Sequence, residues 1–160
     1  MSETYGLLCF SKHWWNPLLW SHYADRHKGI CLGFDVSDAY VFKINYTDLR
    51  TPFTLPLTEN KMDGILSTKY SGWSYEDEWR MWVQLEEPDP EASNYYFREF
   101  DGDIELKEII VGPLCSVSQS KLTAAMRAYS PQPKIIKARL AFKSFKVVKD
   151  QRGLDSITQE

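Results

Sequence analysis

The chain has 160 residues, of which 43% are hydrophobic and 14% are aromatic. This composition excludes a disordered chain and predicts one domain with a sizeable core. The net charge of −3 at pH 7 disfavours nucleic acid as a partner of the whole molecule, because such binding depends on Lys and Arg contacts to phosphates. The charge is uneven, since residues 1–120 hold 10 basic and 19 acidic side chains, a net of −9, and residues 121–160 hold 9 and 3, a net of +6. This asymmetry indicates either two sides of one domain that attract each other or a surface for a partner.

The three cysteines, Cys9, Cys31 and Cys115, are widely spaced and form no C-x-x-C pair. That pattern predicts neither a disulfide framework nor a zinc site. Cys9 and Cys31 lie in apolar runs, which favours buried strand residues over nucleophiles. No apolar run reaches the about 18 residues of a membrane span, and no basic-then-apolar leader starts the sequence. We therefore expect a cytoplasmic protein with reduced thiols and no membrane partner.

The predicted elements begin with a buried strand over Tyr5–Ser11, a short apolar run. The following segment carries residues that typically begin and end a helix. Asn16 is a favoured N-cap, Pro17 suits the first helical position, and Gly29 suits the position after the last turn. Residues 26–28 are basic and would meet the negative end of the helix dipole. A helix over 17–28 is predicted.

The next elements are two strands over 30–36 and 40–46, which we expect to form a hairpin. A helix with Thr58 as its cap is predicted over 57–70, because its apolar residues recur at helical spacing. Residues 74–85 alternate with a period of two, which predicts a strand.

A second hairpin is predicted from residues 94–100 and 104–112, closed by the turn signal Asp101-Gly102. A helix follows over 116–129, with Ser116 or Ser118 as its cap, and it ends before Pro131 and Pro133. Gly112, at the end of its strand, could let a ligand or another backbone approach closely.

The last predicted element is a long strand over 134–148. Its inward face would hold Ile136, Ala138, Leu140 and Phe142. Its outward face would hold Lys137, Arg139 and Lys143. Because hairpins outnumber crossovers, the sequence predicts an α+β fold: a single domain over 1–149 with a mainly antiparallel twisted sheet and about three helices, followed by a flexible polar tail over 150–160.

The first predicted helix carries one candidate for chemistry. On a helix His22 and Asp25 are neighbours at i and i+3, next to Tyr23, and a His–Asp pair can orient an imidazole for acid–base work. The alternative is that Trp20 and Tyr23 pack inward and the polar residues form a solvated face. His22 and His27 cannot chelate one ion from a regular helix, and the sequence contains no metal-binding motif. No metal site is therefore expected.

The strand predicted over 74–85 carries the second candidate. Its alternation would place Glu76, Glu78 and Arg80 on one face. Trp82 continues that face, and a large aromatic beside aligned charges is typical of the floor of a cleft. The alternative is a solvent face with cross-strand ion pairs, which contribute little to stability.

Together the helix and the strand predict a cleft. The candidate catalytic residues are His22, Tyr23, Glu76, Glu78 and Arg80. The candidate residues of the substrate cleft are Trp20, Trp73 and Trp82. The sequence contains no glycine-rich phosphate loop, so no cofactor is evident from its motifs.

Three stretches occur in order along the chain: LLCFSKHWWNPLLWSHYADRHKGICLGFDV, KYSGWSYEDEWR and LKEIIVGP. Together they resemble the bacterial domain-of-unknown-function family 2971, and the resemblance covers residues 7–148. Family members begin with an additional segment that carries a Tyr-Lys-Tyr-like strand and an F-N-D-P-F-E-like turn. The chain is therefore expected to be a short form, or to start further upstream. The resemblance implies an uncharacterised bacterial protein, because the family is defined by its sequence.

Two functions of different classes follow as hypotheses. The first is an enzyme similar in layout to ADP-ribosyltransferases, compact α+β folds that bind NAD as a substrate without Rossmann glycines. In such an enzyme His22 and Tyr23 would lie near the nicotinamide, and Glu78 would polarise the ribose. The second is a non-catalytic interaction module of a bacterial defence or toxin–antitoxin locus, with the acidic and basic regions as its surfaces. The partner would be a small molecule or a protein.

Overall fold

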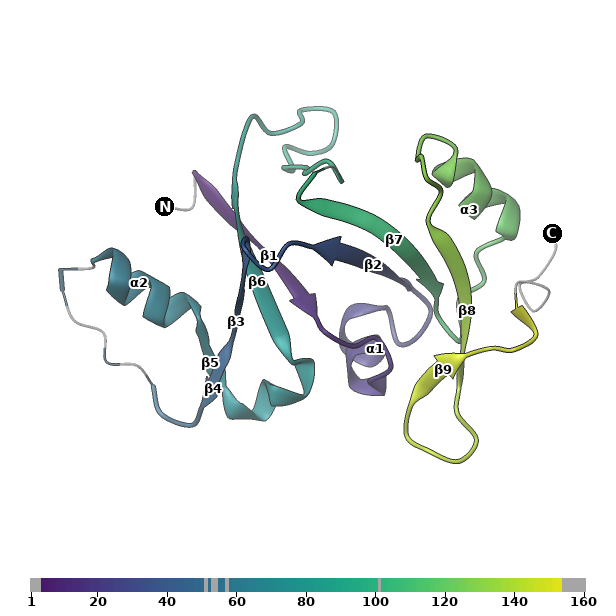
Figure 1. The fold of residues 1–160 in the computed structure, drawn as a ribbon, viewed down its shortest axis with the longest axis horizontal. Helices are drawn as coiled ribbons and strands as arrows, with labels where there is room; N and C mark the ends of the chain where they lie inside the picture. Colours follow the sequence, from purple (N-terminus) through teal and green to yellow (C-terminus); the bar gives the residue numbers. More distant parts are fainter. Residues whose placement is uncertain (1–3, 51, 53–54, 57, 101, 154–160) are drawn as a thin grey trace. The chain divides into compact units, whose positions relative to one another are not determined.

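Short strands are interspersed with a few short helices along the chain (Figure 1). The structure, a computed structural model, describes residues 4–50, 52, 55–56, 58–100 and 102–153. In this part of the chain there are nine strands, three α-helices and one 3-10 helix. The predicted α+β fold with mainly antiparallel strands is confirmed. The structure is consistent with a single domain of this class. The bounds 1–149 stay a prediction.

The chain divides into two compact units, each with its own sheets. The first contains the residues up to His13 and residues 36–99; the second contains Trp14–Asp35 and the residues from Phe100 onward.

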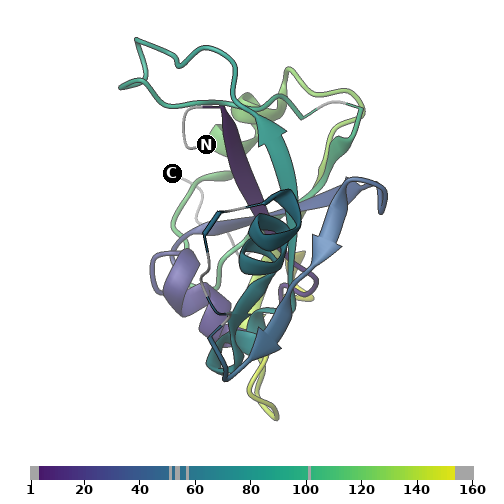
Figure 2. The same cartoon turned by 90° about the vertical axis from the view of Figure 1, so that its left-hand side faces the viewer.

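The first unit is built on a three-stranded antiparallel sheet (Figure 2). Strand β1 (Tyr5–Ser11) pairs along its whole length with β6 (Glu78–Gln84), and β3 (Val41–Lys43) lies on the other edge of β6. Met81 of β6 is 5% exposed and pairs with Leu8 of β1. Strand β6 thus buries an apolar residue in the middle of the sheet.

The rest of the first unit is a two-stranded parallel sheet and two helical segments. They are β4 (Asn45–Thr47), α2 (Glu59–Leu66), β5 (Thr68–Tyr70) and the 3-10 helix η1 (Ser71–Glu76). Thr58 is the N-cap of α2, as predicted. The helix ends at Leu66 instead of residue 70, because residues 68–70 pair with β4.

The strand predicted over 74–85 begins four residues late, at Glu78. Residues 71–76 form η1, and Asp77 then adopts a φ of 43°, in the left-handed region. This turn redirects the chain into β6 and separates Glu76 from the strand on which it was predicted to lie.

The second unit contains a four-stranded sheet in the order β2-β7-β8-β9. Its elements are α1 (Pro17–Tyr23), β2 (Ile30–Val36), β7 (Ile104–Val111), α3 (Gln119–Met126), β8 (Lys134–Leu140) and β9 (Val147–Lys149). Strands β7 and β8 are parallel and α3 connects them, since parallel neighbours need a crossover.

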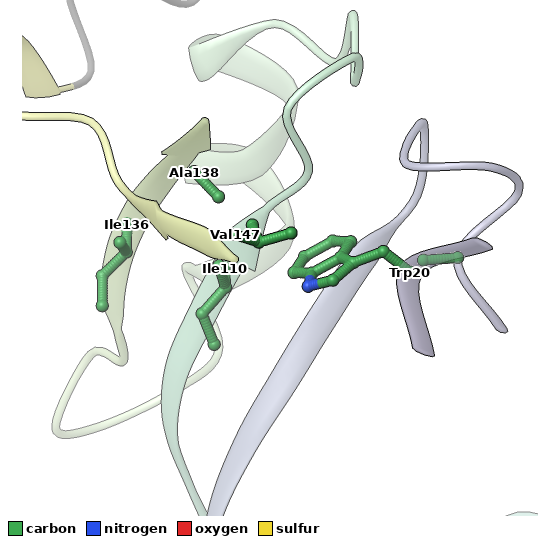
Figure 3. Packing of buried hydrophobic residues seen from close by; sticks show 6 residues of the cluster. Trp20, Ile110, Ile136, Ala138 and Val147 are labelled. Carbon is green, nitrogen blue, oxygen red and sulfur yellow. The ribbon is translucent and has the colours of Figure 1, made fainter. Parts of the chain in front are cut away.

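Strand β7 is buried on both faces. Ile109 and Val111 pack in one cluster with Leu122 of α3. Ile110 belongs to the other cluster, which includes Trp20 of α1 (Figure 3). A strand covered on both sides reads as a continuous apolar run, which explains why the sequence IIV shows no alternation.

Helix α1 begins as predicted, since Asn16 Oδ1 accepts a hydrogen bond of 3.0 Å from Leu18 N and Pro17 is the first helical residue. The prediction that it continues to residue 28 is wrong, because it ends at Tyr23. Residues 25–27 have φ angles of 41°, 52° and 72°.

Pairing with a distant segment explains the early end of α1. The carbonyl oxygens of His27 and Gly29 accept hydrogen bonds of 3.0 Å from Leu114 N and Gly112 N. A Cβ atom on Gly112 would lie 2.5 Å from both carbonyl oxygens. Gly112 therefore permits a close backbone approach, one of the two roles predicted for it.

Both predicted hairpins are wrong. Strands β2 and β3 belong to different sheets. Within residues 94–100 the structure has a single bridge, from Tyr95 to Asp89, and no strand; the predicted turn residue Asp101 lies outside the described residues. Short spacing in the sequence favours pairing between consecutive strands. In the structure β3 instead pairs with β6, and β2 lies beside β7, and both of these partners are longer than β3.

The first residue of the predicted tail packs against β8. Asp150 is 4% exposed, and its backbone N donates to Lys137 O at 2.8 Å. The flexible tail over 150–160 otherwise stays a prediction, and residues 154–160 lie outside the described residues.

Candidate functional site

Four charged side chains of the first unit, here called the Lys69 network, meet at the start of β6. They are Lys69, Glu76, Glu78 and Arg80. Lys69 Nζ donates to Glu78 Oε2 at 2.9 Å and also donates to Glu76 Oε2. Arg80 Nε donates to Glu78 Oε1 at 2.8 Å. Two cations and two anions therefore neutralise each other.

Both carboxylates of the network are buried, with Glu76 3% and Glu78 4% exposed. The alternative of a charged face open to solvent is therefore wrong at these positions. Buried carboxylates need partners, because an unpaired charge away from water is costly.

Lys69 lies in β5 and not in the helix predicted over 57–70, so its place in the network was not predicted. One signal could have found it. If Glu76 and Glu78 are both buried beside Arg80, one negative charge lacks a counterion, and a second cation must come from another segment.

The network fixes the ionisation of Glu78. Burial by itself raises the pKa of Glu78, but hydrogen bonds from Arg80, Lys69 and Cys9, together with the charge of Arg80, lower this pKa to about 2. At neutral pH Glu78 is therefore a carboxylate that is too weak a base for general acid–base catalysis. What it offers is a fixed negative charge.

Cys9 of β1 pairs with Arg80 in the register of the sheet. The residue is exposed, so the expectation that it is buried is wrong, but its thiol is partly desolvated. This desolvation raises the pKa of Cys9. The hydrogen bond with Glu78 and the negative charge of Glu78 raise it further. Because the thiolate is the nucleophilic form, the protonated Cys9 is not poised for attack at neutral pH.

Further hydrogen bonds tie the network to the surrounding backbone. Glu78 N donates to Tyr46 Oη at 2.9 Å, and Arg80 Nη1 donates to Leu66 O. The network thereby joins α2, β4, β5 and β6, which is a structural role sufficient to explain its burial.

Two of the predicted cleft tryptophans lie in the same unit as the network. Trp73 is 36% exposed, and Lys69 Nζ lies 5.3 Å from its ring centroid. Trp82 packs between Tyr5 and Phe42, with both ring centroids 6.4 Å away. Trp82 therefore fills an aromatic cluster across the three strands.

The third cleft tryptophan is a core residue of the second unit. Trp20 is 2% exposed, packs against Ile110 and Val147, and donates from Nε1 to Trp14 O at 2.6 Å (Figure 3). The prediction that Trp20 lines a substrate cleft is wrong, because the sheet covers its indole.

His22 and Tyr23 are exposed on α1, with ring centroids 6.2 Å apart. Asp25 lies beyond the end of the helix, so the predicted His22–Asp25 pair on one helical face is wrong. Both residues belong to the second unit and the Lys69 network belongs to the first. A cleft that joins them stays a prediction.

The second unit carries a different surface at the turn between β8 and β9, here called the β8–β9 tip (residues 141–146). Ala141 N donates to Lys146 O at 2.9 Å, which closes a tight turn. Phe142 is 90% and Phe145 98% exposed. One strand over 134–148, with Phe142 facing inward, was therefore a wrong prediction.

Basic residues flank the two phenylalanines in the sequence. Residues 139–149 contain four basic and no acidic side chains. The Arg139 guanidinium lies 4.6 Å from the centroid of Phe142, and Lys146 Nζ lies 5.7 Å from that of Trp15. Lys137, predicted on this outward face, is 7% exposed and donates to Gly112 O at 2.8 Å. The tip is thus basic and aromatic without Lys137.

A shallow depression of about 280 Å³ adjoins the tip. It is lined by Trp14, Trp15, Lys146, Val147, Val148 and Lys149. Its walls are mainly apolar and its two lysines are positively charged, so it suits an apolar side chain that is accompanied by carboxylates.

The sequence held one signal for this surface. A strand over 134–148 would be longer than the roughly 3–10 residues of most strands, so a turn within it was to be expected. The run AFKSFK breaks the apolar–polar alternation at that turn.

The described residues contain no group of three or more His, Cys, Asp or Glu side chains arranged to hold a metal ion. Among the described helices, none has the length and apolar character needed to cross a membrane. No protein-family model, curated protein or solved structure matches the chain. The resemblance to family 2971 accordingly stays a prediction.

Proposed function

We propose that this chain is a cytoplasmic, non-catalytic interaction module that binds an acidic protein surface through the β8–β9 tip. The observation that carries the proposal is the exposure of Phe142 and Phe145, 90% and 98%. Aromatic side chains so exposed lose contact with water only when a partner covers them, and such residues dominate binding energy at interfaces.

Charge supports a protein as the partner. The tip attracts anions locally, whereas the whole chain has a net charge of −3. A nucleic acid or an anionic membrane extends its charge over a large area and would also repel the acidic part of the chain. A protein can present a local acidic patch with apolar side chains that fit the depression beside Lys146 and Lys149.

The first prediction is that a labelled peptide of alternating glutamate and leucine binds the chain, as measured by fluorescence anisotropy. The double variant Phe142→Ser/Phe145→Ser should bind at least about tenfold more weakly, because it removes the two central apolar contacts. High salt should weaken binding by the wild type, because exposed charges are screened.

The matched control replaces two other exposed aromatic residues, Tyr40→Ser/Tyr70→Ser, and should bind like the wild type. Binding of single-stranded RNA or phosphatidylserine vesicles in place of the peptide would contradict the proposed partner class. Binding of none of these probes would contradict the surface itself.

A second candidate function is an ADP-ribosyltransferase-like enzyme. It is favoured by the buried Glu78, which stays ionised with its pKa near 2. A fixed carboxylate can stabilise the positive charge that develops on a ribose when its glycosidic bond breaks. The ion pairs with Lys69 and Arg80 weaken this field, so we place this function second.

The second prediction separates the two functions by Glu78→Gln. An interaction module should keep its peptide affinity within about twofold, because Glu78 belongs neither to the tip nor to the lining of the depression beside it. NAD should neither be hydrolysed by the wild type nor raise its melting temperature.

Glu76→Gln is the matched control, because it removes one carboxylate from the same network. NAD hydrolysis by the wild type that Glu78→Gln abolishes and Glu76→Gln retains would establish the enzyme.

A further inference from the structure

We propose that the partner of the β8–β9 tip is a second copy of this chain, which contributes the acidic–aromatic loop of its first unit (residues 86–97). This inference rests on the proposed function and names the partner. It also gives a role to residues 86–97, which form no helix or strand of either unit.

The loop complements the tip in charge. Residues 86–97 contain four acidic side chains and no basic one, whereas residues 139–149 contain four basic side chains and no acidic one. The four acidic residues, Glu86, Glu87, Asp89 and Glu91, are all exposed. Facing surfaces of opposite charge steer association and fix its register.

The loop also complements the tip in apolar character. Tyr95 is 66%, Tyr96 44% and Phe97 72% exposed. Aromatic rings that are exposed on both surfaces can bury each other, with edge-to-face or offset geometry. Charge pairs and aromatic contacts would then occur within one interface.

The loop is already held in shape for binding. Asp89 N donates to Tyr95 O and Asn94 N donates to Asp89 O, both at 2.9 Å. Asp89 Oδ1 accepts from Glu91 N at 2.8 Å. These bonds close the loop upon itself, which lowers the entropy that binding must remove.

The tip–loop contact pairs unlike surfaces. Two copies can exchange it reciprocally about a two-fold axis, or each copy can keep one free tip and one free loop, and association then continues until a ring closes or a filament forms. The wild type should therefore form dimers or larger species as its concentration rises. High salt should shift the protein to monomers.

The test uses two double variants that each lack one surface. The tip variant is Phe142→Ser/Phe145→Ser, and the loop variant is Tyr95→Ser/Phe97→Ser. Each variant alone should be monomeric by light scattering after gel filtration. An equimolar mixture should give a dimer, because the intact loop of the tip variant meets the intact tip of the loop variant. Self-association of either variant should be at least about tenfold weaker than that of the wild type.

The control variant Tyr40→Ser/Tyr70→Ser should associate like the wild type. A wild type that stays monomeric at every concentration would overturn the inference, and so would an oligomer that survives both double substitutions. If the glutamate–leucine peptide still binds the tip in either case, the proposed function stands and only the second copy is wrong as the partner. If the peptide does not bind, both fail.

Discussion

Lys69→Met is expected to lower the free energy of unfolding by about 3–5 kcal/mol, because it leaves two buried carboxylates with one counterion. Lys69 donates to both Glu76 and Glu78, which are 3% and 4% exposed. Urea unfolding monitored by tryptophan fluorescence measures this change.

Lys43→Met is the matched control, since Lys43 pairs with Asp77 at 3.2 Å but is 57% exposed. An exposed pair contributes about 0–1 kcal/mol, so this variant should be close to the wild type. If both variants lost the same free energy of unfolding, the Lys69 network would contribute no more to stability than an exposed ion pair, and the prediction would be wrong.

The Lys69→Met variant should also change how the stability responds to acid. In the wild type the pKa of Glu78 falls from 4.5 to about 2 on folding, so the unfolded chain binds a proton more readily. The stability that Glu78 contributes is therefore full above pH 4.5 and is lost as the pH falls toward 2. Lys69→Met removes one of the hydrogen bonds that lower this pKa, so the variant should lose less stability across that interval.

Trp20→Ala is expected to lower the free energy of unfolding by about 3–5 kcal/mol, the usual cost of removing a buried tryptophan. The indole is 2% exposed, packs against Ile110 and Val147, and donates to Trp14 O. The variant loses packing contacts, and it leaves a cavity between α1 and the sheet. Thermal and urea unfolding measure the loss.

Leu18→Ala is the control on the same helix, because Leu18 is 47% exposed. It should cost less than about 1 kcal/mol. If Trp20→Ala unfolded like Leu18→Ala and instead weakened ligand binding, the sequence interpretation of Trp20 as a cleft residue would be right and the packing described above would be wrong.

Local signals predicted the elements whose conformation depends on their own residues. The apolar run Tyr5–Ser11 forms β1, although the prediction that this strand is buried is wrong, since its residues are half-buried or exposed. Asn16 with Pro17 begins α1. An N-cap acts within a few residues, and a strand period is a property of one segment. Both therefore appear in the sequence before any tertiary contact is known.

The candidate site was only partly predictable for the opposite reason. Alternation placed Glu78 and Arg80 on one face of a strand, and they do share β6. Whether that face is buried depends on Lys69, which reaches it from β5. The ionisation and role of Glu78 are consequences of that partner, and no pattern within residues 74–85 contains it.

Burial of single charged residues was likewise a tertiary decision. Lys137 and Arg139 alternate with the same apolar neighbours, yet Lys137 is 7% exposed and donates to the carbonyl oxygens of Gly112 and Cys115. Those acceptors come from a segment more than twenty residues away along the chain. A lysine is stable inside only where such acceptors already converge.

The sequence by itself determined the α+β class, the capping residues at which α1 and α2 begin, and the concentration of positive charge in residues 121–160. The tertiary structure decided which strands pair, which charges are buried, and where the chain turns. The reason is that propensity and capping are local free energies, whereas pairing and burial depend on partners that the fold brings from distant segments. Phe142 and Phe145 show the difference: the sequence contains their aromatic rings, and the turn between β8 and β9 exposes them.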